Sequence, residues 1–266
     1  MIMNIFSFVL FLIVVISGLF ETGSAVKITN IVVPSVTDTN RPVVLDCDYT
    51  LDVDDGALVV KWYFNDGNLV YQWISGHPPT AIGILKGRLN INYKADPADP
   101  NKYHRALSIP NPTSELSGNY TCGVSTFKSE DVRSKQMIVL TQPQYFEIKE
   151  KRLGPRKFEI SCEVKGVFPR PTLSLKLGDR DLTGLKIEVI PNQYIYDAQV
   201  TTVFYAKEDI TEIECLVMVP EANYLTQKKS VLTVKEEIPD AAIASADIRR
   251  YAVHLLNLIL LLVFIV

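Results

Sequence analysis

The sequence predicts an all-β protein made of two tandem antiparallel β-sandwiches. Its 266 residues correspond to about two domains at ~150 residues each. Short runs rich in β-branched and aromatic residues alternate with turns of Pro, Gly, Asn and Asp, and no stretch shows a convincing helical period. The four cysteines fall into two pairs along the chain, which suits one pair for each sandwich.

Composition excludes several other classes of protein. The chain carries 27 Lys and Arg against 30 Asp and Glu, a net charge of −3, and 47% of its residues are hydrophobic. These values exclude a disordered chain and a collagen-like chain. Without a basic excess, no nucleic-acid partner is expected.

The N-terminus has the pattern of a secretory signal peptide over residues 1–25. An apolar run from Ile5 to Ile16 is followed by Gly23 and Ala25, which fit the small positions before a cleavage site. The alternative is an N-terminal membrane anchor, which the short apolar run disfavours. We therefore expect export through the secretory pathway to the extracellular face of the plasma membrane, with oxidised cysteines.

The C-terminus has the pattern of a lipid-anchor signal. The apolar tail at 252–266 would span only about 22 Å as a helix, whereas a bilayer core is about 30 Å thick. Small residues begin at Asp240, and a linker region at 237–251 leads to the tail. This order predicts a glycosylphosphatidylinositol anchor at Asp240, with Ser245 as the alternative site. A short single-pass helix is the competing interpretation.

The first predicted domain, residues 26–142, shows the alternation of half-buried strands. In each of three runs every second residue is apolar: 43–49, 60–64 and 120–124. Within the second run, Trp62 faces inward, so Lys61 and Tyr63 point to the opposite face. A hairpin turn follows at 65–68, where Gly67 permits a positive φ.

Cys47, Trp62 and Cys122 then form the pattern of an immunoglobulin-type sandwich. Tyr120, two residues before Cys122, fits the tyrosine corner, and the long cysteine spacing resembles the variable type. The segment ELSGNYTC has Leu116 where this type usually has Asp. For that reason the customary Arg–Asp pair, for which Arg88 is the candidate, is not expected.

The second predicted domain, residues 143–236, resembles the constant type. Cys162 and Cys215 have the shorter spacing, and the segment that follows Cys162 reads CEVKGVFPRP. The usual tryptophan is absent, since Leu173 and Leu175 occupy its strand. Ile213 stands where a corner tyrosine would be. The resemblance implies two disulfides, Cys47–Cys122 and Cys162–Cys215, each within its own domain.

No constellation of catalytic or metal-binding residues is found, so we expect neither an enzyme, a cofactor nor a bound metal. His77 and His104 have no nucleophile or second histidine at a useful spacing. The acidic run at 52–55 lacks the order and distal Glu of a calcium loop. A secreted enzyme is the alternative from another class. It would require activity that depends on His77 or His104.

Two surface features are also predicted. Asn119 begins the sequon Asn-Tyr-Thr and points outward, so it is the expected glycosylation site. The basic run KEKRLGPRK at 149–157 is typical of a solvated strand edge. Its alternative is contact with heparan chains or anionic lipid headgroups.

The remaining signal indicates a surface for another protein. Residues 62–79 hold more aromatic side chains than an interior needs, and Tyr and Trp are the residue types that anchor interfaces. We predict partner contact through the GFCC′ face of domain one (immunoglobulin strand lettering). The residues expected there are Lys61, Tyr63, Tyr71, Trp73, Phe127 and Lys128. The alternative, that Tyr71 or Trp73 fills the core, stays open because the strand phase after the turn is undetermined.

Most of domain one resembles the invertebrate beaten path family. The segments that carry the resemblance are VKITNIVVPS, LDCDYTLD, VVKWYFNDGNLVYQW with the following Pro78-Pro79, and ELSGNYTCGVS. The resemblance implies a non-enzymatic neuronal recognition protein that acts in axon guidance or synaptic partner choice. It also implies a sidestep-type immunoglobulin-superfamily receptor as partner. An immune-type or homophilic adhesion receptor of the same architecture is the alternative.

Overall fold

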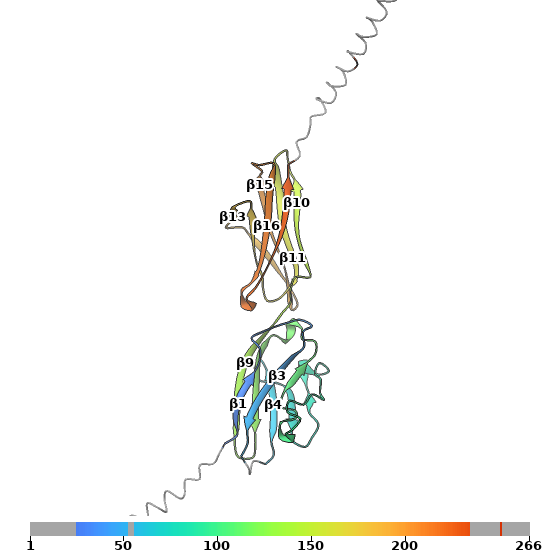
Figure 1. The fold of residues 1–266 in the computed structure, drawn as a ribbon, viewed down its shortest axis with the longest axis vertical. Coiled ribbons are helices and arrows are strands. Elements are labelled where there is room, and N and C mark those ends of the chain that lie inside the picture. Colours follow the sequence, from blue (N-terminus) through green and yellow to red (C-terminus); the bar gives the residue numbers. More distant parts are fainter. Residues whose placement is uncertain (1–24, 53–55, 235–250, 252–266) are drawn as a thin grey trace, which may run out of the picture. The chain divides into compact units, whose positions relative to one another are not determined.

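The computed structural model describes residues 25–52, 56–234 and 251. Almost all of the predicted signal peptide, both candidate lipid-attachment residues (Asp240 and Ser245) and the apolar tail lie outside these residues. The chain divides into two compact units, Met1–Gln142 and Pro143–Val266 (Figure 1). Among the described residues, no helix is long and apolar enough to cross a membrane.

Unit one is a sandwich of two sheets. The smaller sheet has the order β1-β3-β7 and contains β1 (Lys27–Val32), β3 (Val43–Thr50) and β7 (Leu107–Ile109). The larger has the order β2-β9-β8-β4-β5-β6. Its strands are β2 (Val36–Asp38), β9 (Glu130–Leu140), β8 (Gly118–Ser125), β4 (Val59–Phe64), β5 (Asn68–Ile74) and β6 (Thr80–Ala81). All pairs are antiparallel except β2 with β9, which is parallel.

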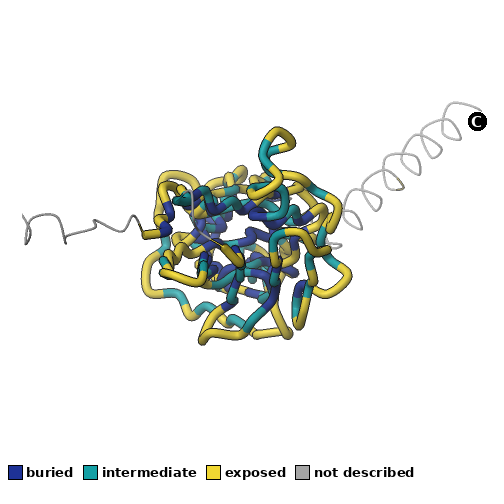
Figure 2. Tube along the Cα trace, turned by 90° about the horizontal axis from the view of Figure 1, so that it is seen from below, coloured by how far each residue is buried: buried dark blue, intermediate teal, exposed yellow. Residues whose placement is uncertain are grey.

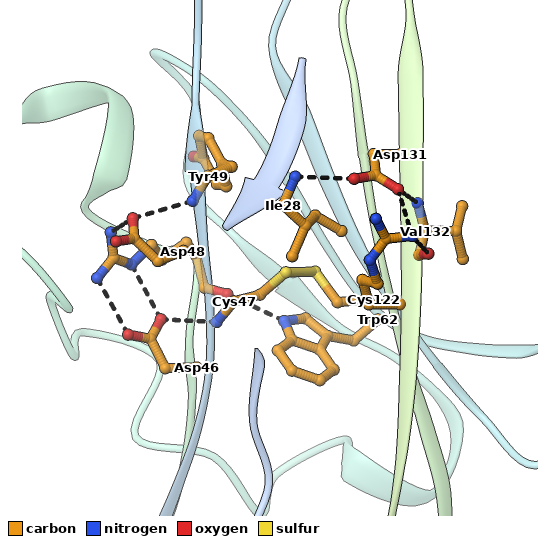
Figure 3. The surroundings of a disulfide bond; sticks show 11 residues. Ile28, Asp46, Cys47, Asp48, Tyr49, Trp62, Cys122, Asp131 and Val132 are labelled. Atoms are coloured by element: carbon orange, nitrogen blue, oxygen red, sulfur yellow. Dashed lines mark hydrogen bonds and ion pairs between the residues drawn. A yellow bond between two sulfur atoms is a disulfide. The ribbon is translucent and has the colours of Figure 1, made fainter. Parts of the chain in front are cut away.

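The interior of unit one is built around the disulfide Cys47–Cys122, whose Cα atoms are 6.5 Å apart. Trp62 pairs with Cys122 across β4 and β8, so its ring packs beside the bridge (Figure 3). The Trp62 indole donates to the Arg105 carbonyl at 3.0 Å, and the Tyr120 hydroxyl donates to the Leu116 carbonyl at 2.8 Å. The buried polar atoms of Trp62 and Tyr120 thus both have partners, and Tyr120 makes the expected tyrosine corner.

A long irregular segment, residues 82–105, connects β6 to β7; we call it the strap. It is fully described and contains no strand, only the 3₁₀ turns η1 (Gly83–Leu85) and η2 (Pro100–Lys102). At its C-terminal end Arg105, only 9% exposed, forms a fork with Asp46 on β3 at 2.9 and 3.0 Å and also bonds Asp48 (Figure 3). Lys102 pairs with the same Asp48 at 2.9 Å.

Arg88, in the first third of the strap, makes an ion pair that the sequence analysis did not expect. Its guanidinium bonds the carboxylate of Glu115 and, at 3.2 Å, the hydroxyl of Thr113. Glu115 lies in η3 (Ser114–Leu116), one residue before the position where variable-type domains usually place Asp. The Arg–acid pair therefore exists with the acid moved by one residue, while Leu116 itself is fully buried.

Unit two is a second sandwich with two four-stranded sheets. One has the order β10-β11-β15-β14 and contains β10 (Tyr145–Arg152), β11 (Lys157–Val167), β15 (Ile195–Tyr205) and β14 (Ile187–Asn192). The other has the order β13-β12-β16-β17 and contains β13 (Arg180–Leu182), β12 (Thr172–Leu177), β16 (Ile210–Val219) and β17 (Tyr224–Thr233). A 3₁₀ turn, η4 (Pro220–Ala222), joins the last two strands.

The core of unit two uses leucine where unit one uses tryptophan. Leu175 pairs with Cys215 across β12 and β16, the same position that Trp62 holds against Cys122. The disulfide Cys162–Cys215 joins the two sheets with its Cα atoms 6.3 Å apart. Ile213 and Leu173 are also buried. Along the Cα trace of the described residues, buried positions lie mostly in the interior and exposed ones mostly at the perimeter (Figure 2).

Candidate functional site

The outer face of the larger sheet of unit one carries the residues predicted to contact a partner; we call it the outer face. Strand pairing aligns Lys61 with Gly123 and Gln72, and Tyr63 with Thr121. Because Trp62 between them is buried, Lys61 and Tyr63 project to the opposite side, where both are half-buried. Gly123 lies on β8, between β4 and β9. On β9, Val132 pairs with Gly123 and is 44% exposed.

Side chains of the outer face close over Gly123, which is itself buried. A Cβ atom added at this position would lie 3.7 Å from the Tyr63 ring, 3.8 Å from Val132 and 3.6 Å from the carboxylate of Glu130, all ordinary van der Waals distances. Gly123 therefore lets an aromatic ring, a valine and a carboxylate meet at the centre of the outer face.

The turn between β8 and β9 presents an aromatic side chain beside this face. Phe127 is 85% exposed, the most exposed large hydrophobic residue in the described part of the chain. The hydroxyl of Thr126 accepts from the backbone N–H groups of Lys128 at 3.2 Å and Ser129 at 3.3 Å. The Phe127 N–H donates to the Gly56 carbonyl at 3.2 Å. The turn is thus fixed by its own hydrogen bonds, and Phe127 extends into solvent with the exposed Lys128 next to it.

Tyr71 and Trp73 are not on this surface, and the expectation that either anchors a partner is wrong. They are 3% and 2% exposed. Tyr71 pairs with Trp62 and Trp73 pairs with Val60, so both side chains share the inward face of the sheet. The Tyr71 hydroxyl donates to the His104 carbonyl in the strap at 2.7 Å, and the Trp73 ring contacts the His104 ring edge-on at 5.7 Å.

The phase of β5, which decides that Tyr71 and Trp73 are buried, depends on an irregularity in the pairing of β4 with β5. Between Trp62 and Tyr63 the register shifts, so that Val70 has no opposite residue and the neighbours Val70 and Tyr71 are both buried. A bulge of this kind changes which side chains face the core. Both aromatic residues contact the strap through His104, so they join it to the inward face of the sheet.

The sequence analysis missed Gly123 and Val132. A signal for Val132 exists, because Glu130, Val132 and Ser134 alternate in a run that ends in buried Met137 and Val139. Gly123 between two inward residues, Cys122 and Val124, had no comparable signal. The position of Gly123 at the centre of the outer face follows only from its cross-strand neighbours Lys61 and Val132.

Asn119, the sequon residue, is exposed near the opposite end of the outer face from Phe127. It lies near the start of β8 and pairs with Gln136 on β9, and its backbone exchanges hydrogen bonds with Asn65 at 2.8 and 3.0 Å. Phe127 follows the end of the same strand. A glycan on Asn119 would leave the half of the face around Gly123 and Phe127 accessible.

The two histidines considered for catalysis have structural surroundings. His77 is an exposed turn residue whose N–H donates to the Ile74 carbonyl at 2.9 Å. His104 lies in the strap, where its Nδ1 is 3.0 Å from the Tyr93 carbonyl. Within the described ranges, no three His, Cys, Asp or Glu side chains come together as metal ligands.

Comparisons with solved structures show that both units have the immunoglobulin-like fold. Bovine butyrophilin superposes with a TM-score of 0.61 at 11% identity, over 75% of this chain and 94% of that one. The mouse nectin-like molecule 4 ectodomain gives 0.54 at 16% identity, over 76% and 66%. A chain from the complex of ICOS with ICOS-L and an anti-ICOS-L VNAR domain gives 0.53 at 14%, over 73% and 97%. At these identities the likeness establishes the fold: two tandem immunoglobulin-like sandwiches.

Sequence comparisons add no closer assignment. No protein-family model matches the chain, and no curated protein sequence matches it significantly.

Proposed function

We propose that this protein is a non-enzymatic cell-surface recognition molecule that binds another cell-surface protein through the outer face of unit one. The observation that carries the proposal is the exposed Phe127 at the end of the outer face, on which the exposed Val132 lies close to Tyr63 around Gly123. A few residues carry most of the binding energy of a protein interface, with Trp, Tyr and Arg the most frequent among them, and Phe is also enriched at interfaces. The structural neighbours include the complex of ICOS with ICOS-L, which supports a protein partner in general.

The finer proposal is a neuronal role with an immunoglobulin-superfamily partner. The resemblance of residues 26–140 to the beaten path family supports axon guidance or synaptic partner choice. It also supports a sidestep-type receptor as the partner. Homophilic or immune-type adhesion is the alternative, and a binding experiment separates the two because a homophilic protein binds its own copies.

Attachment to the membrane completes the proposal. The signal-peptide pattern at 1–25 and both disulfides support passage through the secretory pathway. The small residues from Asp240 onward and the apolar tail support a lipid anchor there. We further propose a glycan on Asn119, whose exposure permits modification.

The test is a binding screen with the full chain displayed on cells. Soluble multivalent ectodomains, including one from this protein and one from a sidestep-type receptor, are applied and bound partners are identified. Tyr63→Ala and Phe127→Ala should each weaken binding by at least about tenfold, as expected when an interface aromatic is removed. Tyr194→Ala removes a 54%-exposed aromatic from unit two and is the matched control.

The outcomes are distinct. Loss of binding in both unit-one variants with the control unchanged supports the proposal. Normal binding by Tyr63→Ala and Phe127→Ala, with loss in the unit-two variant, would place recognition on the other unit and contradict it. Equal surface expression of all three variants shows that folding is intact.

A further inference from the structure

Two side chains of opposite charge, Lys61 and Glu130, lie on the outer face of unit one. Lys61 is on β4 and Glu130 is at the start of β9, with β8 between the two strands. Lys61 pairs with Gly123 and Glu130 pairs with Ser125, two residues further along β8. The two charges are therefore placed diagonally across β8. In the described part of the chain, neither side chain has an ion-pair partner.

The other charged residues of these strands point away from the outer face. The strands β4, β5, β6 and β8 contain no charged residue besides Lys61. On β9, Asp131, Arg133 and Lys135 alternate with the outward residues and lie on the opposite side of the strand. Asp131 pairs with Arg133 at 3.0 Å, and Lys135 donates to the Ile31 carbonyl at 2.7 Å. Lys128 lies beyond the strand ends, in the turn that presents Phe127.

The surroundings of Lys61 and Glu130 on this face are uncharged. Val59 pairs with Ile74 on one side and with Ser125 on the other, in line with Glu130. Ile74 is 39% exposed and Val132 is 44% exposed. A charge that becomes buried in an interface is costly unless it meets an opposite charge. A protein that covers the outer face must therefore offer an acidic group to Lys61 and a basic group to Glu130.

A second copy of the chain meets this requirement with the same two residues. In an interface with two-fold symmetry, a contact of one residue with a second is repeated with the roles of the two copies exchanged. If Lys61 of one copy faces Glu130 of the other, the symmetry also places Glu130 of the first copy against Lys61 of the second. The midpoint between the two charges lies over β8, between Gly123 and Ser125, so the symmetry axis crosses the outer face near its centre.

We infer that the outer face binds the outer face of a second copy of this chain through two reciprocal Lys61–Glu130 ion pairs, and that any other partner competes with this copy. The inference rests on the proposed function, because it takes the outer face as the recognition surface. It goes beyond that proposal by giving the free protein an occupant for the face. Asn119 lies toward the other end of β8, so a glycan there would leave the region of the two charges accessible.

A different protein with one acidic and one basic group at matching positions is the competing interpretation. The observations favour the copy, because the strands of the face carry one charge of each sign and these satisfy each other exactly once per copy. The two interpretations give different results when variants of this chain are mixed with one another.

The test uses the full chain, expressed in the same cells with two different epitope tags. After solubilisation in a mild detergent, one tag is captured and the amount of the other tag recovered with it is measured. Lys61→Glu paired with itself should reduce this recovery at least about tenfold, because both contacts then oppose two acidic groups. Glu130→Lys paired with itself should reduce it equally, because both contacts then oppose two basic groups.

The mixture of the two variants is the decisive measurement. Lys61→Glu expressed together with Glu130→Lys should restore recovery to the unmodified level, because each contact again joins opposite charges. Lys27→Glu is the matched control: it makes the same charge reversal on β1 of the other sheet and should leave recovery unchanged. Restored recovery in the mixture also shows that both variants are folded.

Three results would overturn the inference: no recovery between unmodified copies, unreduced recovery in both single variants, or no restoration in the mixture. Failure of the proposed function has a different signature. If Tyr63→Ala and Phe127→Ala lose a different partner in the binding screen while copies do not capture one another, only the self-association is refuted. If the mixture restores recovery but the screen assigns its partner to unit two, the self-association stands and the proposed recognition surface fails.

Discussion

Two equivalent core positions, Trp62 and Leu175, show how the units differ at the scale of single residues. Each residue pairs with the second cysteine of its own disulfide, and each is almost fully buried. Trp62 also donates a hydrogen bond to the Arg105 carbonyl, so it ties the strap to the core. Leu175 contributes packing alone. Removing either should therefore destabilise its own unit.

We predict that Trp62→Ala lowers the free energy of unfolding of unit one by about 3–5 kcal/mol, as for other buried tryptophans. The chain has only two tryptophans, Trp62 and Trp73, and both lie in unit one. Trp73 fluorescence during urea denaturation therefore follows unit one. Leu175→Ala should leave this transition in place. A shift of equal size in both variants would contradict the assignment of each residue to a separate core.

Tyr71 provides a second prediction at this scale. Burial raises the pKa of its hydroxyl, and the hydroxyl donates to the His104 carbonyl in the strap. Tyr71→Phe removes that hydrogen bond without changing the ring, so it should cost about 1 kcal/mol of stability. Partner binding should be unchanged, because the residue is not on the outer face. Reduced binding by a stably folded Tyr71→Phe protein, measured by surface plasmon resonance, would refute its placement in the core.

At the scale of elements, the strap is held by charges that respond to acid. Burial acts to raise the pKa of the Asp48 carboxyl, but the Lys102 hydrogen bond and the Arg105 charge outweigh it and keep this pKa below its ordinary value. The Arg88 hydrogen bond likewise lowers the pKa of Glu115. A carboxyl whose pKa is lowered on folding stabilises the folded state above its ordinary pKa. That stabilisation is lost as the pH falls through the folded-state value.

Unit one should therefore lose stability as the pH falls below about 4, near the ordinary pKa values of Asp and Glu. Urea midpoints measured by tryptophan fluorescence at several pH values in this range give the slope of the stability of unit one against pH. In Arg88→Met the slope should be smaller, because the pKa of Glu115 returns toward its ordinary value. Lys229→Met, which removes an exposed ion pair in unit two, is the control and should not change the slope. An unchanged slope in Arg88→Met would show that Glu115 does not stabilise the strap.

The same elements show what the sequence could predict and what it could not. Strands β3, β4 and β8 alternate regularly, so Trp62, Tyr63 and Tyr120 were assigned to the correct faces. The phase of β5 could not be read, because an unpaired Val70 changes which residues face inward. The strap was also beyond prediction. Its Arg105 meets Asp46, 59 residues away in the chain, and such a contact leaves no local pattern.

At the scale of the whole molecule, two exposed valines allow a direct test of which surface recognises the partner. Val132 lies on β9 opposite Gly123 on the outer face, and Val231 lies on β17 in unit two; they are 44% and 60% exposed. Each is followed two residues later by a hydroxyl residue, Ser134 or Thr233. Val132→Asn and Val231→Asn therefore each complete a glycosylation sequon with one substitution.

A glycan at position 132 should abolish partner binding, because it would cover the outer face around Tyr63 and obstruct approach to Phe127. A glycan at position 231 should leave binding unchanged. Binding is measured on cells that express each full-length variant, and a mobility shift removed by a glycosidase verifies that each glycan is present. The unmodified protein, with only its own sequon at Asn119, is the reference. Full binding by a glycosylated Val132→Asn protein would exclude the outer face as the recognition surface. If only the Val231→Asn protein lost binding, the partner would have to contact unit two.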